Sequence, residues 1–517
     1  MQVIAEAVKI YSDSLLLSNE GLSDISEEMI NYISANSKCN EINLVGNSLK
    51  QLPDTFGKLK ITSLILSHNQ FQEIPPSVLE ISTLTNLSIK LNKMEKIPAN
   101  IAKLSSLKIL SLSENFKLTN HAALGSLKNL EQLDITANNI SVIPEEFTSL
   151  TNLTSLSLTK NRIKNINNLY NCTNLEKLDI GHNQLMEFPK IVYKFPHLNL
   201  LALSFNPIHS IPEDISKCTA LKMLSLASTS LKNASHLTSL TTLRQLVLSD
   251  NKLTSLSDQF SQLIHLEELH LFANSIHFDF DKTVFCATYS NLLILDLSGQ
   301  NMYCIPDCIG NLVNVQQLNF ANNNIQFIPP SISNCKRLTF LSFTRNQISS
   351  LFPHFFEMKS FVNLEHNLLP GNLNTSWREN LRSEGAPEYM KYHSHTVLNL
   401  SNCGITEINS KWAVLIEQHQ VSSINLSNNK LEYIPVSLLS LKHVELKGNP
   451  LSTIPEPFKG NWHKLKSYLL SIQDNSRKWD RCKLMIVGQE GVGKVNSSIF
   501  HIIQRPSNEI AIFRRLY

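Results

Sequence analysis

Hydrophobic and polar positions recur along this chain with one dominant period. Aliphatic residues stand at the first, fourth and sixth places of a nine-residue string that ends in asparagine, LxxLxLxxN, as in LKILSLSEN and LEELHLFAN. The last place of the string falls at positions 47, 69, 92, 115, 138, 161, 183, 206, 229, 251, 274, 300, 323, 346, 367, 403, 429 and 449, and most steps are 22 or 23 residues. Because side chains alternate along a strand, both leucines of L-x-L point to one side. Each string therefore predicts a short strand with buried leucines.

This period indicates a leucine-rich repeat array. The predicted fold is an α/β solenoid of horseshoe form, with a parallel β-sheet on its concave face and short helices or 3-10 turns outside. Asparagine occupies 15 of the 18 fixed positions, where its amide is suited to bond backbone groups that the turn leaves unpaired. At Thr229, Gln300 and Cys403, which replace it, we expect a weaker ladder.

Breaks in the period suggest how the chain is organised. The step from 367 to 403 is longer than the others and predicts a protruding insertion, and Trp462, Leu465 and Leu469 have the spacing of an amphipathic helix after the last repeat. The expected parts are an N-terminal cap with a degenerate first repeat (1–38), a solenoid of about 18 repeats (39–455, insertion near 370–394), a capping helix and linker (456–480), and a further element (481–517).

Composition excludes several classes of protein. Hydrophobic residues make up 42% of the chain, yet no run of 18 apolar residues predicts a membrane span. The net charge of +3 gives no reason to expect nucleic acid as a partner. Nine scattered cysteines without a CxxC pair favour reduced thiols in a cytoplasmic protein, and no cluster of residues predicts a metal site.

Apolar residues gather at outward positions of several neighbouring strings. These residues are the candidate partner-binding patch on the concave face: Leu200, Phe205, Met223, Val247, His270, Phe272 and Ile294. A contiguous apolar patch is typical of a protein-binding site. The alternative is a set of scattered surface hydrophobic residues, which are normal on any protein.

Near the C-terminus, a short apolar run (residues 483–487) leads into the string GQEGVGK. Gly488, Gly493 and Lys494 match the phosphate-binding frame GxxxxGK[ST], in which glycines let backbone N–H groups surround a phosphate and lysine reaches it. The frame then requires a hydroxyl for magnesium, but Val495 stands there. These three residues are the candidate sites for GTP or GDP with magnesium, and Val495 favours a chain that binds no cofactor.

The repeats, the helix with Trp462 and the string KLMIVGQEGVGK together resemble the Roco family. Its members join leucine-rich repeats to a Ras-like GTPase domain called Roc, a COR dimerisation domain and often a protein kinase. The resemblance implies that 481–517 is the start of a Roc domain, with one strand and a phosphate loop. Because no D-x-x-G or N/T-K-x-D follows, we expect the chain to depart from the family after Lys494.

Two functional hypotheses follow, beside the possibility that the chain belongs to a different intracellular leucine-rich repeat group and matches the phosphate loop by coincidence. The first is a cytoplasmic module or scaffold in signalling that binds a protein on its concave face and has no catalytic residues. The alternative, implied by the resemblance, is a GTP-binding Roco-type GTPase, in a longer product joined to a serine/threonine kinase domain.

Overall fold

The computed structural model describes residues 10–11, 13–35, 39–277, 291–349, 358, 360–369, 397–408, 421–434, 436–451, 454–455, 458, 461–478, 499–504 and 510–515. The chain divides into two compact units, Met1–Leu269 and His270–Tyr517. The predicted insertion at 370–394 lies outside the described residues, as do Gly488, Gly493, Lys494 and the apolar run before them.

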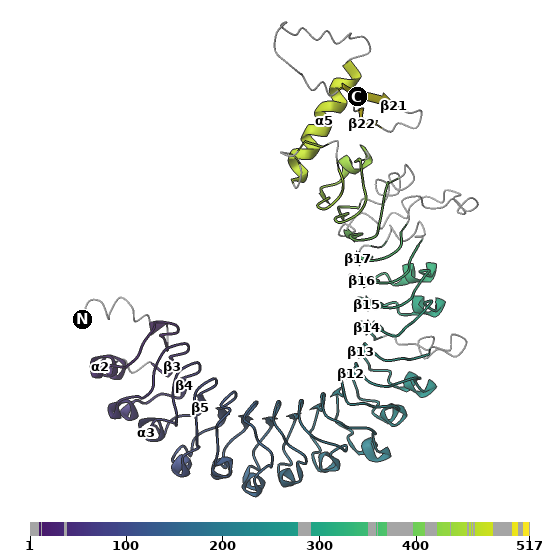
Figure 1. The fold of residues 1–517 in the computed structure, drawn as a ribbon. Helices are drawn as coiled ribbons and strands as arrows, with labels where there is room; N and C mark the ends of the chain where they lie inside the picture. Colours follow the sequence, from purple (N-terminus) through teal and green to yellow (C-terminus); the bar gives the residue numbers. More distant parts are fainter. Residues whose placement is uncertain are drawn as a thin grey trace. The chain divides into compact units, whose positions relative to one another are not determined.

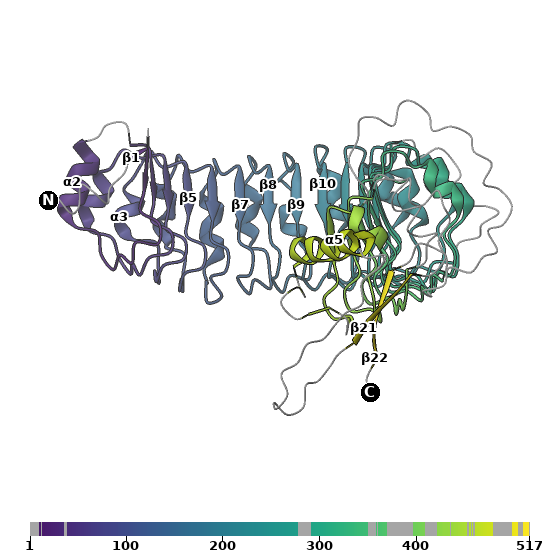
Figure 2. The same ribbon diagram turned by 90° about the horizontal axis from the view of Figure 1, so that it is seen from above.

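In the first unit each repeat contributes one short strand whose middle residue is buried. β1 pairs with β2 antiparallel, and from β2 to β12 every strand pairs with the next in parallel. Figure 2 shows β7 to β10 side by side. The strands are β1 Ile10–Tyr11, β2 Ser14–Leu16, β3 Glu41–Asn43, β4 Ser63–Ile65, β5 Asn86–Ser88, β6 Ile109–Ser111, β7 Gln132–Asp134, β8 Ser155–Ser157, β9 Lys177–Asp179, β10 Leu200–Ala202, β11 Met223–Ser225 and β12 Gln245–Val247.

Short helices occupy the opposite side of the first unit, on the outside of its curve (Figure 1). Several of them begin directly after a proline, whose fixed φ suits the entry into a helical turn. The helices are α2 Glu27–Ala35, η1 Asp54–Lys58, α3 Pro76–Leu79, η2 Ala99–Lys103, η3 His121–Ser126, η4 Glu145–Ser149, η5 Asn167–Leu169, η6 Lys190–Lys194, η7 Glu213–Lys217, η8 Ser235–Ser239 and η9 Asp258–Gln262, where η marks a 3-10 helix.

The second unit repeats the same architecture. β13, Glu268–His270, contains the point at which the chain divides, and from β14 to β20 each strand pairs with the next in parallel. The remaining elements of the repeats are β14 Ile294–Asp296, η11 Asp307–Asn311, β15 Gln317–Asn319, η12 Pro330–Asn334, β16 Phe340–Ser342, β17 Phe361–Asn363, β18 Val397–Asn399, β19 Ser423–Asn425, η15 Val436–Ser440 and β20 His443–Glu445. The predicted α/β leucine-rich repeat solenoid is confirmed.

The asparagine ladder holds successive repeats together. At Asn115, which is fully buried, the Nδ2 group donates to the carbonyl oxygens of Ile89 and Leu112 at 2.9 and 2.8 Å, and Oδ1 accepts from the backbone N–H of Met94 at 3.3 Å. One amide therefore satisfies backbone groups of its own repeat and of the one before, which would otherwise be buried without partners.

The three exceptions keep different parts of this pattern. The side-chain Nε2 of Gln300 still donates to the carbonyl oxygen of Leu271 in the preceding repeat, and the Cys403 thiol donates to that of Leu364 at 3.1 Å. The hydroxyl of Thr229 lies within hydrogen-bond distance of the Leu226 carbonyl oxygen in its own repeat and of Asn251 Oδ1 in the following repeat. Among the described residues it makes no such bond to the preceding repeat. The predicted weakening of the ladder is therefore plainest at Thr229.

Beyond the last repeat lies α5, Trp462–Lys478. Trp462 and Leu465 are buried on one side of this helix, and the Trp462 indole N–H donates to the carbonyl oxygen of Leu441 at 3.4 Å. The helix thus covers the end of the array, where the last repeat has no following neighbour. Farther on, β21 Ile499–Gln504 and β22 Ile510–Arg515 pair antiparallel, a hairpin that the sequence pattern did not predict.

Candidate functional site

The strand face of each unit is the side on which the first and third residues of every strand point away from the core. In the first unit, Leu200 of β10 lies directly beside Met223 of β11 in the strand register, and both are half-buried. Met223 in turn lies beside Gln245, which ends the apolar row. The structure therefore brings together two of the predicted patch residues on neighbouring strands.

Val247 lies apart from this pair. It is the third residue of β12 and its register partner is Ser225, whose own partner on the other side is Ala202. Side chains at first and third places of a strand share one face but stand two residues apart along it. Val247 therefore belongs to the neighbouring row of third-place residues, next to Ser225, and does not continue the row of Leu200 and Met223.

Phe205 stands on the turn that follows β10 and is 48% exposed. Its ring stacks on that of His182, which precedes it by one repeat, with centroids 3.9 Å apart and planes 9° from parallel. Both residues have a positive φ, 58° and 52°. The residue before each ladder asparagine recurs in this left-handed conformation, which few side chains adopt outside glycine and asparagine. Two successive turns thus hold their aromatic rings outward in one stack.

The other three patch residues belong to the second unit. Ile294 is half-buried at the start of β14 and lies beside Gln317 of β15. Phe272 is 42% exposed, and a Cβ atom added to Gly299 would meet its ring at 3.5 Å, so the phenyl ring lies over this glycine. His270 is half-buried as the last residue of β13.

The second unit also holds an apolar row that the sequence analysis missed. Phe340, Phe361 and Val397 begin three successive strands and are register partners. The rings of Phe340 and Phe361 stack with centroids 5.8 Å apart, and Phe361 is 37% exposed. The sequence signal for this row is the residue that begins each strand after Ile294. Because the repeat length changes little up to β17, these first residues become register partners.

The ionisable side chains that burial affects most are held in their neutral forms. Burial raises the pKa of the thiols of Cys172, Cys218, Cys335 and Cys403 to about 11, which leaves them protonated and unreactive. Burial also lowers the pKa of His121 to about 4, and its Nε2 has no hydrogen-bond partner among the described residues. Within the described ranges no three His, Cys, Asp or Glu side chains are grouped to hold a metal ion.

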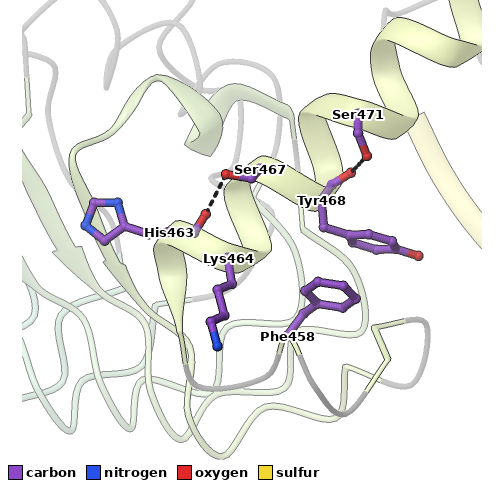
Figure 3. A pocket seen from close by; sticks show the side chains of 6 residues that line it. All are labelled: Phe458, His463, Lys464, Ser467, Tyr468 and Ser471. Carbon is purple, nitrogen blue, oxygen red and sulfur yellow. Dashed lines mark hydrogen bonds between the residues drawn. The ribbon is translucent and has the colours of Figure 1, made fainter.

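An open hollow lies along α5 (Figure 3). The rings of Phe458 and Tyr468 stack there with centroids 4.3 Å apart. The hydroxyls of Ser467 and Ser471 donate to carbonyl oxygens of their own helix, at 3.0 and 2.7 Å. His463 and Lys464 also line the hollow, which is wide open and does not enclose a small ligand.

In the part of the chain that the structure describes, no helix is both long and apolar enough to cross a membrane. Nucleotide binding at Gly488, Gly493 and Lys494 stays a prediction, because these residues lie outside the described ranges.

Comparison with known proteins supports the repeats directly. The family model described as Leucine rich repeat matches residues 116–163 and 128–185, and that described as Leucine Rich repeats (2 copies) matches residues 313–355. No curated protein matches the chain.

Solved structures share the fold at low sequence identity. A leucine-rich repeat protein of Leptospira interrogans is 21% identical, with a TM-score of 0.56 over 90% of this chain and 96% of that one. The ectodomain of the plant membrane receptor kinase GASSHO1/SCHENGEN3 from Arabidopsis thaliana is 22% identical, with a TM-score of 0.54 over 82% of this chain and 63% of that one. The functional domain of InlJ from Listeria monocytogenes is 17% identical, with a TM-score of 0.53 over 69% and 74%.

Proposed function

We propose that this chain is a protein-interaction module that binds a partner protein on its strand face and acts without catalysis. The observation that carries the proposal is the cluster on the first unit, where Leu200 and Met223 adjoin in register and Phe205 is 48% exposed on the following turn. Apolar surface that a partner removes from water contributes about 25 cal/mol per Å² before the entropic cost of association is subtracted. Large apolar side chains of this kind are the usual anchors of protein interfaces.

The architecture suits this role because the backbone of the strand face makes its hydrogen bonds within the sheet. Leu200 N–H donates to the carbonyl oxygen of Glu176 at 3.0 Å and Met223 N–H to that of Asn199 at 2.9 Å. The outward side chains are therefore left to contact a partner without unpairing the strands. The GASSHO1/SCHENGEN3 ectodomain, which shares the fold, was solved in complex with CASPARIAN STRIP INTEGRITY FACTOR 2, a precedent for partner binding by such a solenoid.

A photo-crosslinking experiment tests the proposal. A benzophenone amino acid placed at Met223 should capture one defined protein from a cell extract, whereas the same group at Val142, which is 68% exposed, should not. The double substitution Phe205→Ser and Leu200→Ser should abolish the capture. Equal labelling from Met223 and Val142, or capture that survives the double substitution, would contradict binding at this cluster.

We further propose that the chain is a cytoplasmic relative of the Roco family. The string from Lys483 to Lys494 supports the relationship, and the free, buried Cys172 and Cys218 support a reducing compartment. Nucleotide binding is the alternative function and rests on Gly488, Gly493 and Lys494.

Calorimetric titration with GDP and GTP in magnesium separates the two functions. We expect no heat from binding, because Val495 provides no hydroxyl for the metal. Micromolar binding that disappears in a Lys494→Ala variant would instead establish a working phosphate loop.

A further inference from the structure

The strands β15 to β19 of the second unit contain no charged residue among their fifteen. Two rows of register partners cross these strands, one over β16 to β18 and the other over β17 to β19. The apolar row is Phe340, Phe361 and Val397, and the amide row is Asn363, Asn399 and Asn425. Together these six residues form what we call the amide–aromatic face. The strands of the first unit differ, since they include Asp134, Lys177 and Asp179.

The three amides of this face are held in one orientation by their own turns. Each Oδ1 atom accepts a hydrogen bond from the backbone N–H two residues farther along, at 3.0 Å for Asn363, 3.2 Å for Asn399 and 2.9 Å for Asn425. Their Nδ2 groups have no acceptor among the described residues, although all three side chains are only half-buried. The amide row therefore offers free hydrogen-bond donors, while each acceptor oxygen already accepts one bond from its own turn.

The apolar row supplies aromatic surface beside these donors. Phe340 and Phe361 stack with planes 15° apart, and Val397 adjoins Phe361 in the register. Phe361 keeps 37% of its surface exposed. Contact with an aromatic ring adds to the free energy gained from burying apolar area, because the flat ring packs closely against another flat or cyclic group.

We infer that the amide–aromatic face binds a neutral, proline-rich segment of the partner in the polyproline II conformation. The inference rests on the proposed function and names a second surface for it. Strands β15 to β19 offer a charged segment no counter-charge for the hydration that it would lose. The carboxylate beside the amide row, Glu445, lies outside these strands on β20, in register with Asn425. Proline has no N–H group, so a proline-rich segment presents carbonyl acceptors to a row of donors and needs no acceptor in return. Aromatic side chains are also the usual surface on which proline rings pack.

The repeat distances of the two structures agree. Adjacent strands lie about 4.8 Å apart, so Asn363 and Asn425, two strands apart, are separated by about 9.6 Å. A polyproline II helix repeats every three residues, or about 9.3 Å, and presents equivalent carbonyl groups at that interval. A fully extended strand repeats after about 6.8 Å and falls out of step with the amide row.

Binding of a synthetic peptide to the full 517-residue chain tests this inference. The probe is a ten-residue peptide of eight prolines and two leucines three places apart, acetylated and amidated so that it carries no charge. Fluorescence anisotropy of a labelled copy should show saturable binding. A peptide with aspartate or lysine in place of both leucines should bind more weakly.

The chain supplies its own matched variants. Aspartate stands at the amide-row place in other repeats, where Oδ1 of Asp134, Asp179 and Asp296 accepts the same backbone N–H at 3.1, 3.0 and 3.0 Å. The double substitution Asn399→Asp and Asn425→Asp should therefore keep both turns while it removes the donors. We expect it to weaken peptide binding about tenfold or more.

Two further variants complete the set. Phe361→Ser should also weaken binding about tenfold or more, and its fold should persist because Ser155 and Ser423 begin other strands in the same way. Asn43→Asp, at the amide-row place of β3 in the first unit, is the control and should leave peptide binding unchanged.

Several outcomes would overturn the inference. The first three are the absence of saturable binding, equal binding by the Asn399→Asp and Asn425→Asp variant, and tighter binding of a charged peptide. The fourth is binding that needs the deletion of residues 370–394, which would assign the face to the chain's own insertion. Loss of peptide binding alone, with photo-capture at Met223 intact, would refute this inference and spare the proposed function. Peptide binding without photo-capture at Met223 would instead refute the proposed function at the Met223 cluster and spare the peptide-binding inference.

Discussion

Replacing Asn161 with threonine is expected to open the solenoid locally between two repeats. The Nδ2 group of Asn161 donates to the carbonyl oxygens of Ile135 and Leu158 at 3.0 and 2.8 Å. Its Oδ1 atom accepts from the backbone N–H groups of Asn138 and Ile140 at 3.0 and 2.9 Å. Three of these four bonds reach back to the preceding repeat, so the amide is a crosslink between repeats as well as a turn-former.

Thr229 shows what threonine retains in this position. Its hydroxyl donates to Leu226 in its own repeat at 2.8 Å, while the N–H of Ile208 in the preceding repeat donates instead to Asn206 at 2.7 Å. Asn161→Thr should therefore lose the bonds to the preceding repeat and leave one carbonyl and one or two N–H groups buried without their partner. At about 1–3 kcal/mol for each unsatisfied group, and with one N–H able to find a local acceptor, the expected cost is about 2–5 kcal/mol.

Hydrogen exchange is the appropriate assay, because repeats open with their neighbours and a single global transition is not assured. Amides of residues 130–161 should exchange faster in the variant, while those of residues 40–70 should keep the wild-type rate. The midpoint of urea unfolding, followed by circular dichroism, should fall as well. A change below about 0.5 kcal/mol in local opening, or equal acceleration in both segments, would refute the crosslink argument.

Three more predictions concern packing and ionisation. Gly125→Ala should destabilise the chain by about 1–3 kcal/mol in urea unfolding, because the added Cβ would lie 2.4 Å from the backbone oxygen of Glu146; an unchanged midpoint would contradict this. Because burial lowers the pKa of His121 to about 4 from 6.5, the unfolded chain takes up a proton first, so stability should be lost as pH falls from about 6.5 to 4. This loss of up to about 3 kcal/mol in the free energy of unfolding should be absent from the His121→Gln variant. Identical pH profiles of stability for the variant and the wild type would show that His121 is not the cause. Iodoacetamide should label the exposed Cys304 rapidly and spare Cys172, whose pKa burial raises to about 11; mass spectrometry of the native protein checks the order.

The repeat fold could be predicted from sequence because two simple physical requirements recur in every unit. The aliphatic residues of L-x-L must share one side of a strand, and the buried turn must have its backbone groups satisfied by an amide such as Asn115. Each requirement leaves a fixed spacing in the sequence. The three departures at Thr229, Gln300 and Cys403 were visible for the same reason, and the structure shows which bonds each one keeps.

The candidate surface was only partly predictable. Neighbours such as Leu200 and Met223 follow from a constant repeat length, since equal places in successive repeats become register partners. Phe340 and Phe361 obey the same rule, because the step of 21 residues between them is close to the usual repeat length and makes them register partners. The division of the chain after Leu269 has no comparable signal, because the string LEELHLFAN that spans it is a regular one.

The stack of Phe205 on His182 could not be predicted, because it depends on backbone conformation. The residue before each ladder asparagine recurs with a positive φ, although glycine fills that place at only a few repeats, such as Gly46 and Gly448. Phenylalanine gains nothing locally from a left-handed conformation, which costs it about 1–2 kcal/mol. The ladder and the sheet must therefore impose the conformation, and the repeat does so whatever side chain stands there. The place before the asparagine therefore keeps one backbone conformation in successive repeats, so that a bulky residue there changes the exposed surface without changing the fold.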